Sequence, residues 1–353
     1  MSTFSACFLG CGRINEKHLA LLRALRPGTR LAVASRDPKT AETYARKTGV
    51  PRWFGSYDEA LDARYDLYVV GTLPSAHHGL VKRIVAAGHH CLVEKPVFSS
   101  LEEFQDLWPL LFSSRGLFMV AENLHFAPFQ RRLKQVMADP ALGRPLMMDL
   151  TRLGRSRPKG WRLDPREMPL GALHEGGVHW IRRLLDLASA LESDGQSHVL
   201  DVMAYSPQPP VTATPHEDTM MVVARHRSGL TTRLLHTWAV PWRFPLFDAS
   251  KLLCEHGAVY FDARGLYGRS YGPKGRRLLA PNVRDAGGYR AMWQAFVESL
   301  ETQSPPPLPL RTIYDDFAYM DAAYRSLRSG RPEAPRPPLP ESGVTTASVG
   351  PSL

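Results

Sequence analysis

The chain has 353 residues, of which 44% are hydrophobic and 22% are charged. These proportions are ordinary for a soluble globular protein and exclude a wholly disordered chain, and the length is typical of two domains. Lysine and arginine number 44 against 34 aspartates and glutamates, which gives a formal net charge of +10 at pH 7.

No membrane-spanning or targeting segment is predicted. The longest apolar runs, such as 67–70 and 117–121, are far shorter than the roughly 20 residues that a spanning helix needs. The first residues pass directly into the apolar run 4–9 without the basic stretch of a signal peptide. We therefore expect a soluble cytoplasmic protein with no membrane partner.

The positive charge does not indicate nucleic-acid binding. Basic residues are scattered, and their densest stretch, 152–166, is interrupted by prolines and a glycine, without a recognition-helix pattern. We expect no nucleic-acid partner, because attraction for a phosphorylated cofactor or an acidic substrate explains the sign equally well. The four cysteines show no CxxC spacing, which predicts free thiols in a reducing compartment and no metal site.

The first part of the chain alternates predicted strands and helices. Strands are predicted over 4–9, 31–34, 67–71, 91–93 and 117–121, and helices over 14–26, 38–48, 77–87 and 101–111. This order predicts a doubly wound parallel sheet with helices on both faces, as in a Rossmann domain over residues 1–122.

Beyond residue 122 the pattern changes. Helices are predicted over 129–137, 177–191, 289–300 and 313–329, and strands over 145–153, 199–205, 220–227, 231–238 and 251–255. Ser228-Gly229 is a predicted hairpin turn, and strands that follow one another directly indicate an open, mostly antiparallel sheet. We assign residues 123–330 to a second domain of mixed α/β structure. The tail 331–353, rich in Pro, Ser, Gly and Thr, is predicted to be disordered.

A glycine-rich turn follows the first predicted strand and opens the first helix, reading GCGRIN over residues 10–15. In a dinucleotide fingerprint Gly10 would make the turn and Gly12 would let the pyrophosphate approach the helix N-terminus. Asn15 replaces the third glycine, so the motif is incomplete. Its position as the first strand-to-helix turn favours a cofactor site over a turn without a ligand.

The end of the second strand indicates which cofactor binds. NAD sites usually have an acidic residue here for the ribose 2′-hydroxyl. This chain has Ser35-Arg36-Asp37, and a guanidinium suits a 2′-phosphate. We predict NADP(H), with NAD(H) as the alternative if Asp37 turns inward.

Three further residues carry candidate chemistry. Lys95 lies in Glu94-Lys95-Pro96 at the end of the fourth strand, where ligands of parallel sheets collect, although a lysine there can also be simply solvated. Glu175 and His179 are four residues apart, so a helix covering both would place a carboxylate beside an imidazole, as general acid–base catalysis needs. Structural roles for this pair remain the alternative.

Taken together, these motifs resemble the Gfo/Idh/MocA oxidoreductase family over roughly residues 4 to 331. The resemblance rests on GCGRI over 10–14, TLPSAH over 72–77, the Glu-Lys-Pro strand end, Trp161-Arg162, the Glu175-x-x-x-His179 segment and AAYRS over 322–326. It implies a Rossmann domain followed by a substrate-binding and oligomerisation α/β domain over residues 123–330. It also implies NAD(P)-dependent hydride transfer to or from a carbinol or carbonyl carbon of a sugar, inositol or related polyol.

The resemblance also implies roles for individual residues. Lys95 and His179 would be catalytic, together with Glu175, which stands where the family usually has Asp. The cofactor would be bound by Gly10, Gly12, Arg13, Ile14, Ser35, Arg36, Thr72, Leu73, Pro74, His77, Glu94, Lys95, Asn123, Trp161 and Arg162. Leu73 departs from the family, which often has Pro there. Members commonly form homodimers or homotetramers.

Two alternatives of the same fold stay open: an NAD-recycling enzyme with no net redox change, such as a glycoside-cleaving one, and a non-catalytic dinucleotide sensor. The substrate is also open. Basic residues in and near one loop suit an acidic or phosphorylated substrate, but a solvated basic loop is as consistent with the sequence. They are Arg152, Arg155, Arg157, Lys159 and Arg162.

Overall fold

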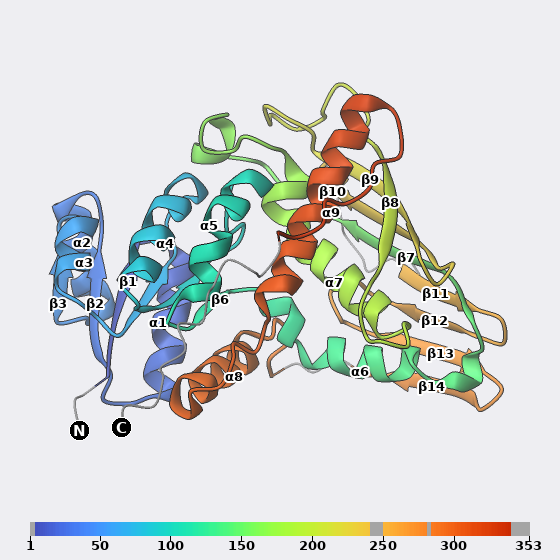
Figure 1. Cartoon of the computed structure of the whole chain (residues 1–353), viewed down its shortest axis with the longest axis horizontal. Coiled ribbons are helices and arrows are strands. Elements are labelled where there is room, and N and C mark those ends of the chain that lie inside the picture. The colour runs from blue at the N-terminus through green and yellow to red at the C-terminus, as the bar shows by residue number, and fades with distance from the viewer. Residues whose placement is uncertain (1–3, 241–249, 281–283, 340–353) are drawn as a thin grey trace, which may run out of the picture.

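A computed structural model describes residues 4–240, 250–280 and 284–339. It contains two β-sheets, with helix α9 (Leu310–Ser329) running between them (Figure 1). Within the described residues, no helix combines the length and the apolar character that crossing a bilayer requires.

The first sheet is parallel and has the strand order β3-β2-β1-β4-β5-β6. Its central strands are fully buried apolar segments, as expected for a sheet covered by helices on both faces. The strands are β1 (Ser5–Leu9), β2 (Arg30–Ala34), β3 (Arg52–Phe54), β4 (Leu67–Val70), β5 (His90–Val93) and β6 (Phe118–Val120). The helices are α1 (Arg13–Leu25), α2 (Pro38–Thr48), α3 (Tyr57–Asp62), α4 (His77–Ala86) and α5 (Leu101–Ser113).

The second sheet has eight strands in the order β14-β13-β12-β11-β7-β10-β9-β8, and only the β7–β10 pair is parallel. The strands are β7 (Pro145–Leu153), β8 (Val199–Tyr205), β9 (Thr219–His226), β10 (Thr231–Thr237), β11 (Ser250–Cys254), β12 (Ala258–Phe261), β13 (Gly268–Gly272) and β14 (Gly275–Leu279). Buried residues alternate with more exposed ones along β9 and β10, so helices cover one face only.

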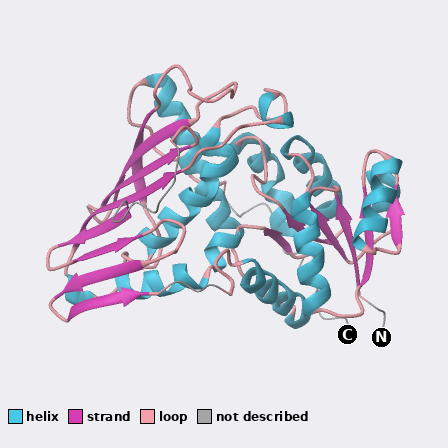
Figure 2. Cartoon of the chain, turned by 180° about the vertical axis from the view of Figure 1, so that it is seen from behind, coloured by secondary structure: helices cyan, strands magenta, loops and turns pink. Residues whose placement is uncertain are grey.

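The covering helices are α6 (Pro128–Met137), α7 (Val178–Ser189) and α9. Seen from behind, the helices fill the space between the two sheets (Figure 2). Helix α8 (Tyr289–Thr302) returns to the first domain and packs against α1. The fold predicted from the sequence, a Rossmann sheet followed by a mostly antiparallel one, is therefore confirmed.

Among the α-helices and strands of the described residues, five short ones were not predicted: β3, α3, β12, β13 and β14. They have three to six residues each, so hydrophobic periodicity has too few repeats to show. The last two strands are also rich in arginine and glycine, and they are strands because they pair with their neighbours in register. The hairpin at Ser228-Gly229 is confirmed, with Gly229 at a φ of +86° between β9 and β10.

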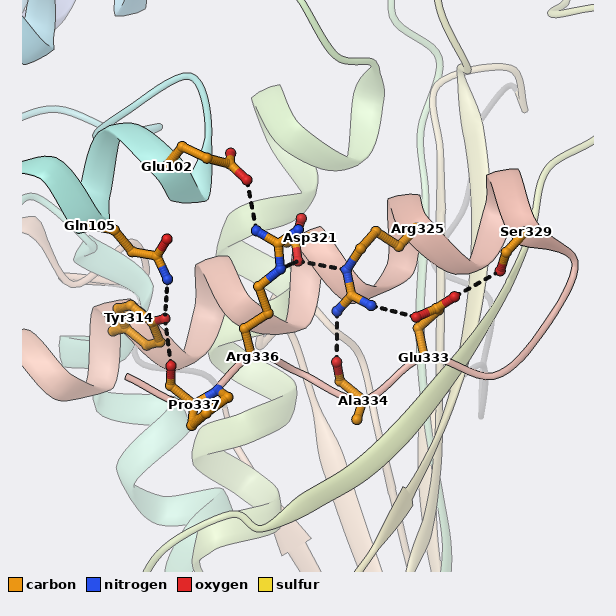
Figure 3. A network of polar contacts seen from close by, with 10 residues as sticks. All are labelled: Glu102, Gln105, Tyr314, Asp321, Arg325, Ser329, Glu333, Ala334, Arg336 and Pro337. Carbon is orange, nitrogen blue, oxygen red and sulfur yellow. Dashed lines mark hydrogen bonds and ion pairs between the residues drawn. The ribbon is translucent and has the colours of Figure 1, made fainter. Parts of the chain in front are cut away.

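The tail differs from the prediction of disorder over residues 331–339. Glu333 exchanges two main-chain hydrogen bonds with Val202 of β8, which extends the sheet edge. The side chain of Arg325 donates to Glu333 and to the carbonyl of Ala334, and Arg336 pairs with Glu102 of α5 (Figure 3). This strap, residues 331–339, is rich in proline, which is typical of disorder, so composition alone does not reveal its polar anchoring. Residues 340–353 lie outside the described residues.

Replacement of Arg325 by Ala is expected to lower the free energy of unfolding by about 1–3 kcal/mol, because the half-buried guanidinium satisfies Asp321, Glu333 and a carbonyl at once. Urea denaturation measures the change. Arg331→Ala, at an exposed position of the same strap, should leave the midpoint unchanged. Equal effects of the two substitutions would show that the strap does not depend on this network.

Candidate active site

The carboxyl ends of β1 and β4 meet where the strand order reverses, which is the usual ligand-binding point of such sheets. Gly10 has a φ of +97°, and a Cβ atom there would stand 2.6 Å from the carbonyl oxygen of Gly71. Gly12 is the N-cap of α1, and no side chain among the described residues caps it. The first N–H groups of α1 are therefore free to bind a phosphate.

Asn15 is buried and belongs to the turn itself. Its Nδ2 donates to the carbonyls of Leu9 and Gly10 at 2.9 and 2.8 Å. A Cβ atom on Gly71 would stand 2.4 Å from its Oδ1, so the amide fills the space between the two strand ends. Asn15, which replaces the third glycine of the pattern, thus holds the turn through two buried side-chain hydrogen bonds. Arg13 is exposed and Ile14 half-buried in the first turn of the same helix.

At the end of β2, Asp37 is engaged locally. Its carboxylate is the N-cap of α2 and accepts hydrogen bonds from the main-chain N–H groups of Lys39 and Thr40 at 3.3 and 3.0 Å. The hydroxyl of Thr40 also donates to it, and this bond holds the pKa of Asp37 below its usual value. Arg36 is exposed, and Ser35 is half-buried and accepts from the N–H of Asp37.

Glu94 is buried at the end of β5 and lies 2.7 Å from Nε2 of His18. Trp293 donates its indole N–H to Nδ1 of His18 at 2.9 Å. Because the indole can only donate, Nε2 must carry the proton of a neutral His18 and donate it to Glu94. Burial would raise the pKa of Glu94, but the hydrogen bond and charge of His18 outweigh it and leave the pKa lowered.

The remaining residues predicted at this edge are mostly buried. The ring nitrogens of His77 lie 3.0 and 3.3 Å from the carbonyls of Pro96 and Thr72. Pro74 is buried, and Leu73 is half-buried beside it. Asn123 follows β6 and donates from Nδ2 to the carbonyl of Gly287 at 2.6 Å.

Lys95 reaches across to the second domain. Its Nζ donates to the main-chain oxygen of Glu175 at 3.0 Å, within a π-helical turn formed by Leu173–Gly177. The Glu175 carboxylate accepts from Nη2 and Nε of Arg162 at 2.6 and 3.2 Å, and that guanidinium lies 4.4 Å from the ring centre of Trp161. Burial would raise the pKa of Glu175, but the charges of Lys95 and Arg162 outweigh burial and leave the pKa lowered. The group therefore stays a carboxylate.

The prediction that the Glu175 carboxylate lies beside the His179 imidazole is wrong. Nδ1 of His179 instead lies 2.5 Å from Oε1 of Glu122, which is 2% exposed at the end of β6. The π-helical turn changes the spacing, and Arg162 occupies the Glu175 carboxylate. Sequence reasoning missed Glu122, although its place directly after a predicted strand could have indicated it.

Two other residues missed by the sequence analysis support the π-helical turn. Oε1 of Glu217 accepts from the N–H of Leu173 at 3.0 Å and from the hydroxyl of Tyr324 at 2.8 Å. The same hydroxyl accepts from the N–H groups of Gly171 and His174 at 3.2 and 3.3 Å. Burial raises the pKa of Glu217 to about 7. Tyr324 lies in the AAYRS motif, which therefore connects α9 to the site.

Together, the site holds an ammonium, an imidazole and a carboxylate at the carboxyl edge of the parallel sheet. The imidazole has one nitrogen bonded to a buried carboxylate, which is the arrangement of a positioned acid–base group. Among the described residues, no group of three or more His, Cys, Asp or Glu side chains is arranged to hold a metal ion. Such a site can exchange a proton with a bound hydroxyl or carbonyl group.

Two family models match the chain. One, described as an oxidoreductase family with an NAD-binding Rossmann fold, matches residues 4–122, and the Gfo/Idh/MocA C-terminal domain model matches residues 130–259. The chain therefore belongs to the Gfo/Idh/MocA family of oxidoreductases. This confirms the resemblance expected from the motifs.

Curated relatives match over part of their length. Trans-1,2-dihydrobenzene-1,2-diol dehydrogenase of Sus scrofa is 33% identical over 139 residues, which are 38% of this chain and 41% of that protein. The Homo sapiens enzyme of the same name is 29% identical over 174 residues, 48% of this chain and 52% of that protein. The chain thus spans about two fifths to one half of these relatives.

Solved structures match over nearly the whole chain. A levoglucosan dehydrogenase in complex with NADH and levoglucosan has a TM-score of 0.80 at 18% identity and covers 95% of this chain and 100% of that one. The WlbA dehydrogenase from Bordetella pertussis, in complex with NADH and UDP-GlcNAcA, has a TM-score of 0.76 at 21% identity, covering 96% and 98%. At these identities the likeness shows a shared fold.

Replacement of Glu217 by Gln is expected to change how stability depends on pH. The pKa of Glu217 is raised from 4.5 to about 7 in the folded chain, so its contribution is full below pH 4.5 and is lost as the pH rises through about 7. The variant should therefore gain stability relative to the wild type over this range, by up to about 3 kcal/mol. Denaturant unfolding at several pH values measures the difference.

Glu298→Gln, at an exposed position of α8, is the matched control and should give a difference that does not vary with pH. A Glu217 variant that tracks the wild type at every pH would contradict the raised pKa.

Proposed function

We propose that the protein is an NAD(P)-dependent oxidoreductase that transfers a hydride between nicotinamide and a carbinol or carbonyl carbon of a sugar-like or polyol molecule. The observation that carries this proposal is the pair of groups at one sheet edge, Lys95 held by the Glu175 carbonyl and His179 held by Glu122. The names of the curated relatives, which are diol dehydrogenases, and of a levoglucosan dehydrogenase with the same fold support a cyclic polyol substrate.

The residues present fit a dinucleotide. The Gly10 backbone conformation is closed to other residues, and the uncapped N-terminus of α1 offers N–H groups to a pyrophosphate. A nicotinamide cofactor, when bound, supplies or accepts the hydride. Everything else in the reaction concerns positioning and one proton.

His179 transfers the proton of the reacting group, and Lys95 polarises its oxygen. The bond from Nδ1 of His179 to Glu122 fixes the tautomer of the neutral ring, so Nε2 is the nitrogen that accepts a proton from a carbinol during oxidation. In the reductive direction the protonated ring returns it to the developing alkoxide. One of the three N–H groups of the Lys95 ammonium donates to the Glu175 carbonyl. The other two are left to polarise the reacting oxygen.

Glu175 has a positioning role in this scheme. Its carboxylate is engaged by Arg162 and its carbonyl orients Lys95, so one residue fixes two cations around the reacting carbon. We expect the substrate to lie between these groups and Trp161-Arg162. The longer reach of Glu175, compared with the Asp usual in the family, favours this contact with Arg162.

Substitution of Lys95 by Met, or of His179 by Asn, is expected to lower kcat by about 10²-fold or more while NADPH affinity changes little, because each removes a proton donor or acceptor and not the phosphate site. Wild type and variants are assayed for NAD(P)H formation with levoglucosan, myo-inositol, D-glucose and a trans-dihydrodiol, and cofactor binding is followed by nucleotide fluorescence.

Turnover of none of these compounds by wild-type protein that binds NADPH would contradict the proposed reaction and favour the sensor. Glycoside cleavage with no net change in NAD(P)H would instead favour the NAD-recycling enzyme. Unchanged kcat in both variants would remove the assigned roles of Lys95 and His179.

We further propose a preference for NADP(H) and for the reductive direction. Ser35 and the exposed Arg36 stand where the 2′-phosphate would bind, and the Asp37 carboxylate is occupied by the α2 cap, which disfavours a bond from Asp37 to a ribose hydroxyl. The absence of another acidic residue directly at this strand end in the sequence supports the same preference.

Arg36→Gln is expected to weaken NADPH binding by about tenfold or more and to leave NADH binding unchanged, because a charged hydrogen bond to the 2′-phosphate is lost. Fluorescence titration with both nucleotides measures this. Arg46→Gln, at an exposed position on helix α2 that follows Arg36 in the chain, should affect neither. Equal weakening of NADH and NADPH binding by Arg36→Gln would contradict the 2′-phosphate role.

A further inference from the structure

His236 is a buried histidine that nothing in the described part of the chain satisfies. It lies near the end of β10 and is 3% exposed, and neither of its ring nitrogens has a hydrogen-bond partner there. Buried polar side chains are bonded in the large majority of cases, and an unpaired one is costly. An imidazole left in this state therefore indicates a partner outside the described residues, such as a bound ligand.

Arg152 is its neighbour on the adjacent strand. The two residues are paired in the parallel register of β7 and β10, so their side chains leave the same face of the sheet. Nη1 of Arg152 donates to the carbonyl of Leu153, and the guanidinium lies 5.3 Å from the ring centre of Trp180, the residue after His179. Nε of Arg152 is buried and, among the described residues, has no partner.

The side chain of His236 approaches the active site at Gly176. A Cβ atom on Gly176 would stand 3.5 Å from Nε2 of His236 and 3.4 Å from Nε1 of Trp238. Gly176 is half-buried and directly follows Glu175, whose carbonyl holds Lys95. The charges that act on the ring of His236 include those of Lys95, Glu175 and His179. We call Arg152, His236 and the space beside Gly176 the Arg152 corner.

The charges of this corner favour an anion. Glu175 is already engaged by Arg162, whereas no carboxylate within the described chain pairs with Arg152. Burial and the nearby Arg264 lower the pKa of Arg152 to about 10, so it remains a cation at neutral pH. Burial also lowers the pKa of His236 to about 3, which keeps the ring neutral with one N–H donor.

A neutral hydroxyl could pair with either nitrogen but would bring no charge to the half-buried guanidinium, on which Asp262 is the carboxylate that acts. A carboxylate accepts from both side chains and supplies a negative charge.

We propose that Arg152 and His236 form a subsite for a carboxylate of the substrate, which makes the substrate a sugar acid or a related polyhydroxy acid. This rests on the proposed function, because it names the substrate class of the same site. The carboxylate accepts a hydrogen bond from Nε of Arg152 and one from the ring N–H of His236. The hydroxylated carbons then extend past Gly176 towards Lys95 and His179.

The test compares two probes that differ only in this group. D-gluconate and D-glucitol have the same chain of hydroxylated carbons, ending in a carboxylate or in an uncharged CH₂OH. Calorimetric titration of the NADP⁺-saturated protein should show gluconate binding at least about tenfold more tightly, as expected for hydrogen bonds to a charged group. Arg152→Gln should abolish the preference, and Arg131→Gln, an exposed guanidinium on α6, should preserve it.

A second variant separates a binding role from a structural one. His236→Leu removes two unpaired buried nitrogens, so it should raise the unfolding midpoint while it weakens gluconate binding by about tenfold. A residue with a purely structural role would not give this opposite pair of changes. This variant also keeps the test decisive if Arg152→Gln does not fold.

Three results would overturn the proposal: equal affinity for the two probes, a gluconate preference that survives in both variants, or no gluconate binding at millimolar concentration. Failure of the proposed hydride transfer is visible separately. In that case gluconate would still bind through Arg152 and His236, but no NAD(P)H would form with gluconate or with any of the other compounds.

Discussion

Two buried carboxylates at the carboxyl ends of neighbouring strands, Glu94 after β5 and Glu122 after β6, govern how this structure is put together. A buried charge is unfavourable unless it is paired, and each of these finds a histidine. His18 also accepts from Trp293 of α8, and His179 lies in the first turn of α7, the helix that supports the second sheet. Pairing these acids therefore docks the second domain on the first and fixes the imidazole of the site in one step.

The π-helical turn Leu173–Gly177 depends on a second set of buried polar groups. Glu217 and the hydroxyl of Tyr324 accept three of the main-chain N–H groups around it. The π-helical turn directs the Glu175 carbonyl towards Lys95 and the Glu175 carboxylate towards Arg162. The geometry of the candidate site is thus set by residues from both domains, and a small shift of either domain would alter it.

The hydrogen-bonded networks around the site contrast with the Arg152 corner, where buried nitrogens lack partners in the described chain. Most buried polar side chains near the site have partners, whereas Arg152 and His236 keep nitrogens without any in the described chain. Such groups lower the stability of the free protein, and a site gains from them only when a ligand supplies the partners. The contrast separates residues that hold the site together from residues available to a substrate.

The sequence by itself determined the doubly wound, parallel character of the first sheet, the glycine turn and the position of Lys95, because alternating strands and helices carry clear periodicity and turns need particular residues. It could not place His179 against Glu122, which are 57 positions apart, or show that Arg162 engages Glu175. It also missed the bonded strap at Glu333 and the unpaired state of His236. Those outcomes depend on which buried charges and N–H groups meet after folding, and only the tertiary structure decides that.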